Sequence, residues 1–122
     1  MLTLPAAVRI YACLRPVDFR RGFDGLATLV REGLGRDPLS GDVFVFRNRR
    51  GDRIKILFWD RDGFWLWYKR LERGTFRFPR SEQEACEIDP AELHCILAGL
   101  DLTGRGRQQR YVRLPKRCAC VS

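Results

Sequence analysis

The sequence predicts an α+β domain in which an antiparallel, four- to five-stranded meander sheet carries two helices packed mainly on one face. Two observations support this prediction. Residues 43–78 hold ten of the chain's fourteen aromatic residues, interleaved with arginine and lysine and broken by short turns that contain glycine. Such runs are typical of strands joined by hairpins. Apolar residues at helical spacing on either side of this segment indicate the two helices.

The first strand is expected at Val8–Cys13, where side chains alternate, and Pro16 ends it. A helix should follow, because the carboxylate of Asp18 can accept hydrogen bonds from the free N–H groups of a first turn. The apolar stripe of this helix is Phe19, Phe23, Leu26, Val30 and Leu34. Three glycines in this stretch each lower the stability of the helix by about 1 kcal/mol relative to alanine. We expect that they are present because the helix packs closely against the sheet.

The remaining strands are expected at Val43–Arg47, Arg53–Trp59, Phe64–Leu71 and Thr75–Phe78. The loops between them are short and contain glycine, which favours a continuous antiparallel meander. Successive side chains of a strand point to opposite faces of the sheet. One face is therefore expected to be core, and the other to mix cations with aromatic rings.

Residues 80–87 are polar and acidic and are interpreted as a connector. A second helix should begin at Asp89, with Pro90 at its first position and Glu92 able to reach back to the cap. We expect one α+β domain at residues 1–102. Residues 103–122 contain six Lys/Arg and no acid, which predicts a basic, flexible C-terminal tail.

The formal charge of +8 and the sequence pI near 9.8 favour contact with polyanions, and such contact depends on salt. The alternative is a soluble protein that happens to be basic. No apolar run approaches the ~18–20 residues of a membrane span, and no signal-peptide core is visible, so a cytoplasmic location without membrane contact is expected. The five cysteines show no paired spacing, which fits a reducing compartment.

Cations interleaved with aromatic rings are typical of surfaces that bind nucleic acid. The residues expected to contact phosphates are Arg47, Arg49, Arg50, Arg53, Lys55, Lys69, Arg70, Arg73 and Arg77. The residues expected to stack on bases or to contact a protein partner are Trp59, Trp65 and Trp67. The alternative is that the aromatic residues form core beneath the helices while the cations are merely solvated.

The sequence predicts no catalytic residue, metal or cofactor. The single histidine, His94, has no recognisable nucleophile or acid beside it. Asp60 and Asp62 could bind a metal for phosphodiester cleavage, but aspartate is also common in turns for purely structural reasons. Asp52, in another turn, should lie at the opposite end of the sheet. Cys118 and Cys120 are too few for a zinc site, and no glycine-rich phosphate loop is present.

Two blocks of sequence resemble a known family. The first is Val17–Leu26, which reads VDFRRGFDGL, and the second is Val43–Asp60 with its continuation through Asp62–Phe64 and Trp67–Phe76. They resemble the Orf2-like accessory protein, often called TnpB, of the IS66 family of bacterial insertion sequences. That protein is distinct from the RNA-guided nuclease of the same name. The resemblance covers residues 4–103, and the residues after Gly104 match no pattern of the family.

The resemblance implies a role in transposition beside a separate, larger transposase that supplies the catalytic residues. Expected partners are therefore DNA and the transposase proteins of the same element. The predicted function is a non-catalytic accessory protein that binds DNA, the transposase complex or both through its basic aromatic sheet. A protein-interaction module without DNA binding is the first alternative, and a metal-dependent nuclease is the least favoured one.

Overall fold

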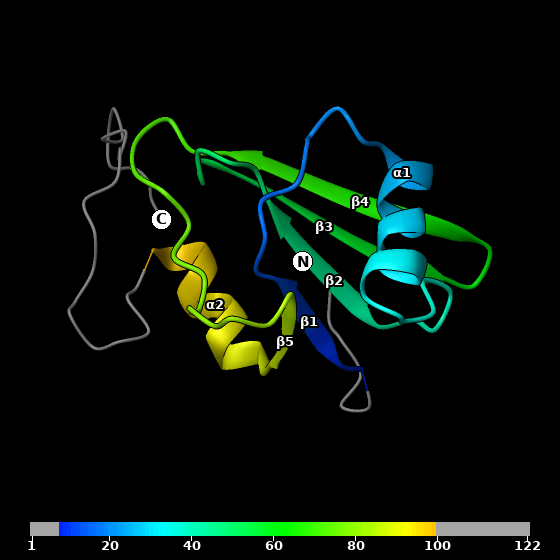
Figure 1. The fold of residues 1–122 in the computed structure, drawn as a ribbon. Coiled ribbons are helices and arrows are strands. Elements are labelled where there is room, and N and C mark those ends of the chain that lie inside the picture. Colours follow the sequence, from blue (N-terminus) through cyan, green and yellow to red (C-terminus); the bar gives the residue numbers. More distant parts are fainter. Residues whose placement is uncertain (1–7, 100–122) are drawn as a thin grey trace, which may run out of the picture.

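The computed structural model describes residues 8–99. In this range the strands are β1 (Ile10–Cys13), β2 (Val43–Arg47), β3 (Arg53–Asp60), β4 (Gly63–Arg70) and β5 (Ala85–Ile88). The helices are α1 (Phe23–Thr28), which continues as a π-helical turn η1 (Leu29–Gly33), and α2 (Pro90–Ala98) (Figure 1). The predicted α+β class is confirmed. The predicted basic tail lies outside the described residues, and the domain boundary at residue 102 stays a prediction.

The strands of the described region form one sheet in the order β4-β3-β2-β1-β5. The expected meander is confirmed for β2, β3 and β4, which pair antiparallel in sequence order. The sheet is nevertheless mixed, because β1 pairs parallel with β2, with Ile10 opposite Val43. The connection between these two strands runs through α1, and a helical crossover makes its flanking strands parallel. The expectation of a purely antiparallel sheet is therefore wrong.

The fifth strand lies elsewhere than expected. Residues 75–78 form no strand; the N–H of Phe76 instead donates to the carbonyl oxygen of Gly51 at 2.7 Å, and its ring is buried. The strand is β5, within the expected connector, where it pairs antiparallel with β1. Its four residues carry no strong alternation of their own, so the pairing with a strand some 75 residues earlier decides its conformation.

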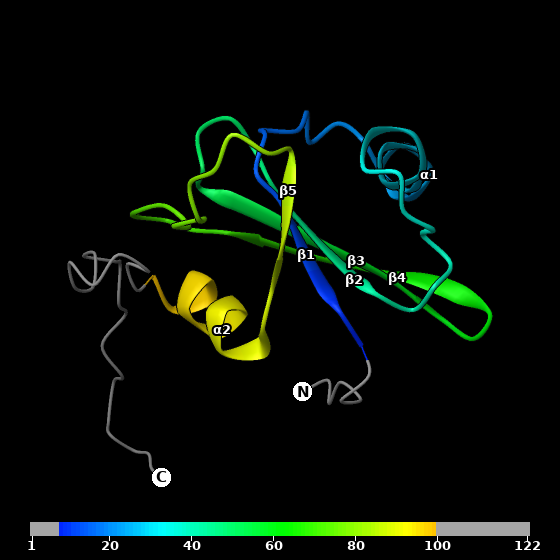
Figure 2. The ribbon, with the colours of Figure 1, turned by 60° about the horizontal axis from the view of Figure 1, so that its bottom comes forward.

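The two helices cover opposite faces of the sheet, as Figure 2 shows. One core cluster joins Leu26 and Val30 of the α1 region to Phe44, Phe46 and Leu57. The other joins α2 to the alternate residues of the same strands, namely Ile96 to Val43, Val45, Ile54, Ile56 and Phe58. The expectation of helices mainly on one face is wrong, because β2 is apolar on both sides and both sides must be covered.

The first helix begins at Phe23, four residues later than the stripe suggested. Asp18 does not cap it; its carboxylate accepts from the N–H of Arg20 at 2.9 Å within the preceding loop. The expected contact of helix glycines with the sheet is also wrong. A Cβ on Gly25 would meet the side chain of Arg21, and one on Gly33 would meet Leu29.

The second helix begins as predicted. Asp89 accepts from the N–H of Glu92 at 2.7 Å, and the Glu92 carboxylate accepts from the N–H of Asp89 at 3.0 Å. Gly99, with φ of 78°, ends the helix. No helix within residues 8–99 is both long and apolar enough to cross a membrane, and the expected cytoplasmic location stays a prediction.

Candidate nucleic-acid interface

Lys55 lies inside the protein. Only 5% of it is exposed, and its ammonium donates to the carbonyl oxygens of Phe19 and Arg21, each at 2.8 Å. The same ammonium lies 4.9 Å from the centroid of the Phe19 ring and 5.0 Å from that of Tyr68. All of these contacts are internal, so Lys55 fixes the loop before α1 and is not part of the interface that we propose.

Arg47 is also engaged internally. Its Nη2 donates to the carbonyl oxygen of Leu14 at 2.7 Å, and its guanidinium lies over the ring of Phe78 at 5.7 Å. Its Nε is buried and makes no hydrogen bond within the described region, and this burial lowers the pKa of the guanidinium. Arg47 therefore ties β2 to the segment after β1 and is left out of the proposed contact set.

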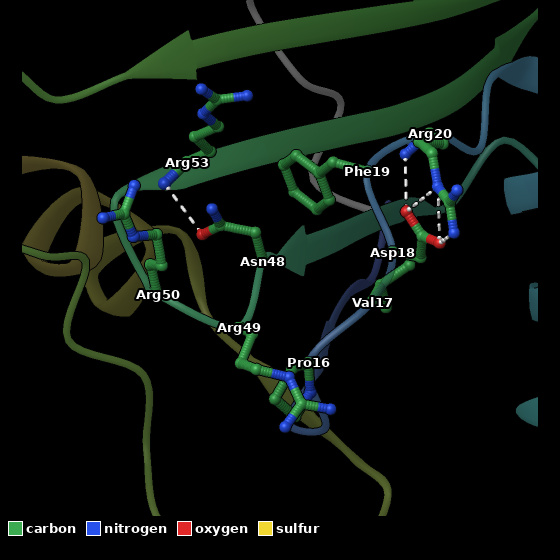
Figure 3. Close-up of a pocket in the computed structure, with 9 residues that line it drawn as sticks. All are labelled: Pro16, Val17, Asp18, Phe19, Arg20, Asn48, Arg49, Arg50 and Arg53. Atoms are coloured by element: carbon green, nitrogen blue, oxygen red, sulfur yellow. Dashed lines mark hydrogen bonds and ion pairs between the residues drawn. The ribbon is translucent and has the colours of Figure 1, made fainter.

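Three other predicted residues come together around one cavity. Arg49, Arg50 and Arg53 lie on the turn between β2 and β3 and at the start of β3. The cavity between this turn and the loop before α1 has a volume of about 540 Å³. Among residues 8–99 it is lined by Pro16, Val17, Asp18, Phe19, Arg20, Asn48, Arg49, Arg50 and Arg53, and Figure 3 shows the Phe19 ring between the two walls.

Asn48 shapes the turn that carries these arginines. Its Oδ1 accepts from the N–H of Arg53 at 3.1 Å, and its Nδ2 donates to a carboxylate oxygen of Asp52 at 2.8 Å. Gly51 supplies the left-handed φ of 78° that the tight turn requires. Arg49 and Arg50 are left exposed at the tip, and neither forms an ion pair within residues 8–99.

Asp18, the one acid among the described residues that line the cavity, is neutralised by its neighbour. The Asp18 carboxylate accepts from Nη2 of Arg20 at 2.7 Å and from Nε at 3.0 Å. These side-chain hydrogen bonds, together with one from the N–H of Arg20, lower the pKa of Asp18 to about 2. The cavity therefore keeps the positive charge of Arg49, Arg50 and Arg53.

The third arginine is fixed in direction by an aromatic neighbour. Nη1 of Arg53 donates to the hydroxyl of Tyr68 at 3.0 Å. The Tyr68 ring in turn meets the Phe19 ring edge to face, with centroids 5.8 Å apart. Cation and aromatic ring thus lie side by side in this cavity, which is the combination that nucleic-acid surfaces use for phosphates and bases.

The other predicted cations lie near the same end of the sheet or on β4. Arg73 and Arg77 are exposed on residues 71–78, a segment that returns to the β2–β3 turn through the hydrogen bond from Phe76 to Gly51. Lys69 is exposed on β4, and Arg70 is paired with Glu72 at 3.2 Å. Arg73 and Arg77 therefore lie near the turn that carries the cavity arginines, on a segment whose Phe76 and Phe78 pack into the core cluster of the α2 side.

The tryptophans do not join the arginine cavity. Trp65 and Trp67 lie on the α2 face, where both rings contact Phe58, and they are 52% and 40% exposed. Trp59 points to the α1 face, where its half-buried ring meets Phe64 edge to face. Trp65 and Trp67 thus lie on the opposite face of the sheet from the cavity arginines, and Trp59 lies on the α1 face but does not line the cavity.

The acidic turn residues give no support to a metal site. Asp60 ends β3 and lies at the opposite end of that strand from Asp52, as the meander implies. Across residues 8–99, no three His, Cys, Asp or Glu side chains gather where they could bind a metal ion. His94 is exposed on α2. Cys13 is a free, buried thiol whose pKa is raised by that burial.

Comparison with known proteins places the chain in a family. Residues 8–107 match the family model described as IS66 Orf2-like protein. The chain belongs to the IS66 Orf2-like family. Its members are accessory proteins of transposition. The resemblance seen in the sequence is thereby confirmed.

Two relatives of this IS66 Orf2-like chain come from Sinorhizobium fredii. The uncharacterized protein y4jC is 46% identical over 96 residues, which covers 79% of this chain and 82% of y4jC. The uncharacterized protein y4hO is 42% identical over 101 residues, which covers 83% and 88% of the two chains. No solved structure matches the chain.

The fold brings the two sequence blocks of this IS66 Orf2-like protein into direct contact. The N–H of Val17 donates to the carbonyl oxygen of Arg47 at 2.9 Å, and Lys55 reaches the carbonyls of Phe19 and Arg21. The cavity lies between the blocks. Sequence reasoning missed Asp18, Phe19, Arg20 and Asn48 as lining residues, although Asp18–Arg20 falls within the first block.

Proposed function

We propose that this IS66 Orf2-like chain is a non-catalytic accessory protein that binds DNA during transposition through the arginine cavity. The observation that supports this proposal most strongly is the pairing of Asp18 with Arg20. Within residues 8–99, this pairing leaves the charges of Arg49, Arg50 and Arg53 at the cavity without an acidic partner. Guanidinium groups bind phosphate oxygens through paired hydrogen bonds, so the cavity suits a sugar–phosphate backbone.

The proposed contact set is smaller than the set predicted from sequence. Arg49, Arg50 and Arg53 form its centre, and Arg73 and Arg77 extend it. Lys69 and Arg70 lie on β4 and are assigned to its margin. Phosphate contacts fix position without reading sequence, so we expect binding to duplex DNA with little sequence preference.

Fluorescence anisotropy with labelled duplex and single-stranded DNA at low salt tests the proposal. Arg49→Glu and Arg50→Glu should each weaken binding about tenfold or more, because each replaces an attraction to phosphate by a repulsion. Arg31→Glu is the matched control, since Arg31 is an exposed residue of η1 and the change in net charge is identical. Absence of binding, or equal losses in all three variants, would contradict the proposal.

A second candidate function is docking of a protein partner on the α2 face, with the element's transposase proteins as the expected partners. It is favoured by Trp65 and Trp67, two large aromatic side chains that remain exposed on a face without the arginine cavity. Exposed tryptophans commonly dominate protein interfaces. DNA and protein could then be bound at the same time on separate surfaces.

Co-purification with the element's other proteins tests this second function. Trp65→Ala combined with Trp67→Ala should abolish capture while leaving the DNA affinity of a single arginine cavity unchanged, because neither ring lines that cavity. Phe23→Ala is the control, because Phe23 is a comparably exposed aromatic residue on α1. Unchanged capture in the double variant would exclude this face.

A further inference from the structure

The edge strand β4 is unusually apolar for its position. It is the last strand on its side of the described sheet, and its residues 63–68 read GFWLWY, without a charge (Figure 1). Trp65 and Tyr68 in this run are each about half exposed. Proteins usually protect a long edge strand with charges, bulges or a covering segment, because its free backbone groups pair with other strands. An unprotected apolar edge of this kind is expected to pair with another strand.

We propose that β4 pairs antiparallel with β4 of a second copy of this chain, with Leu66 opposite Leu66 of that copy. The two sheets then form one continuous sheet around a twofold axis. This dimer does not depend on the proposed DNA binding, and either can hold without the other.

The backbone of β4 presents the groups that this pairing needs. The two-residue turn Arg61–Asp62 is closed by the pair Asp60 and Gly63. A hairpin closed in this way directs the N–H and C=O groups of Gly63 toward β3, and the direction alternates along the strand. The backbone groups of Phe64, Leu66 and Tyr68 therefore point outward from the sheet.

The proposed register matches aromatic residues with each other on both faces. Trp65 lies opposite Trp67 of the second copy on the α2 face. Phe64 lies opposite Tyr68 of the second copy on the α1 face. Aromatic cross-strand pairs of this kind stabilise antiparallel sheets, and the Trp65–Trp67 pair occupies the closer, non-hydrogen-bonded position. The strand is thus complementary to itself.

Charges at the two ends of β4 select the register. Asp62 precedes the strand and lies opposite Arg70 of the second copy, so each dimer contains two such pairs. A shift of the pairing by two positions one way would place Asp62 opposite Glu72. The same shift in the other direction would place Arg61 opposite Lys69. Both alternatives juxtapose like charges, which destabilises strand pairing.

The twofold axis stands perpendicular to the sheet, so the two α1 faces look in the same direction. The dimer would therefore present both arginine cavities on one side. Two linked sites on one side can engage a single DNA duplex together, which strengthens binding without new contacts.

Sedimentation equilibrium of the full chain over a wide concentration range tests the dimer. The wild type should be dimeric, and Leu66→Pro should be monomeric, because proline removes an outward N–H at the centre of the interface. Proline is tolerated at such an edge position, so the thermal unfolding midpoint, followed by circular dichroism, should show that Leu66→Pro remains folded. A monomeric wild type, or a dimer unaffected by Leu66→Pro, would overturn the proposal.

A charge exchange tests the register without proline. Asp62→Arg and Arg70→Asp should each weaken the dimer about tenfold, since each creates two like-charge pairs. The double variant, Asp62→Arg with Arg70→Asp, should dimerise more tightly than either single one. Asp24→Arg, an exposed acid on α1, is the control for net charge and should leave the dimer intact. Failure of the double variant to improve on the single variants would overturn this register.

Amide hydrogen exchange distinguishes a second copy from a covering segment of the same chain. Protection of the N–H groups of Phe64, Leu66 and Tyr68 should rise with protein concentration if the cover is a second copy. Protection that is independent of concentration, in a monomeric protein, would assign the edge to another part of the same chain and overturn the dimer.

Discussion

The ammonium of Lys55 lies 2.8 Å from the carbonyl oxygen of Phe19 and 4.9 Å from the centroid of its ring. A side chain from the middle of β3 thus fixes both the backbone and the ring of a residue 36 positions earlier. Since Phe19 lines the arginine cavity, this buried lysine determines the shape of the cavity without contacting what binds there.

Lys55→Met should lower the free energy of unfolding by about 1–3 kcal/mol, because methionine leaves the carbonyls of Phe19 and Arg21 without their donor. Urea denaturation measures the change. Lys69→Met is the control, since Lys69 is an exposed lysine of β4, and it should change stability by less than about 0.5 kcal/mol. Equal effects of the two substitutions would contradict the structural role of Lys55.

The pKa of Asp18 is expected to be about 2 in an NMR titration of its carboxyl carbon. Because this pKa is below the ordinary value of 3.8, the ionised carboxylate stabilises the folded loop above about pH 4. That contribution is lost as the pH falls toward 2. Arg20→Ala should raise the pKa of Asp18 toward its ordinary value, and Arg31→Ala should leave it unchanged. An unshifted Asp18 in the wild type would contradict the pairing.

Gly51→Ala should destabilise the fold by about 1–2 kcal/mol, because Gly51 has φ of 78° and an L-residue is strained in that region. Lack of room is not the cause, since an added Cβ would lie 3.5 Å from the nearest atom, on Thr75. Gly22→Ala is the control: its φ is −98° and nothing lies within 4 Å, so stability should stay equal or rise slightly. Thermal denaturation measures the stability of both variants, and equal effects of the two substitutions would contradict strain at Gly51.

Local signals in the sequence predicted the elements that local forces determine. The capping box at Asp89 and Glu92 marks α2, and short turns with glycine mark the meander of β2, β3 and β4. The parallel pairing of β1 with β2 depends on a crossover about 30 residues long, and β5 depends on β1 for its conformation. Both pairings join segments that are far apart in the chain, so no local sequence pattern reveals them.

The cavity was predictable in part. Arg49, Arg50 and Arg53 stood out as cations near a turn, and the structure places them together. Lys55 was indistinguishable in sequence from its neighbour Arg53, because both alternate with apolar residues on the same strand. Their environments differ only because the loop at Phe19 folds over Lys55 and leaves Arg53 at the rim of the cavity.

The salt dependence of DNA binding tests the central claim most directly. The logarithm of the association constant, measured by anisotropy, should fall linearly with the logarithm of salt concentration for the wild type. Replacing both Arg49 and Arg50 by alanine should reduce the steepness by about 0.9 for each phosphate contact removed. A double variant with the wild-type slope and affinity would show that the arginine cavity does not contact the DNA backbone.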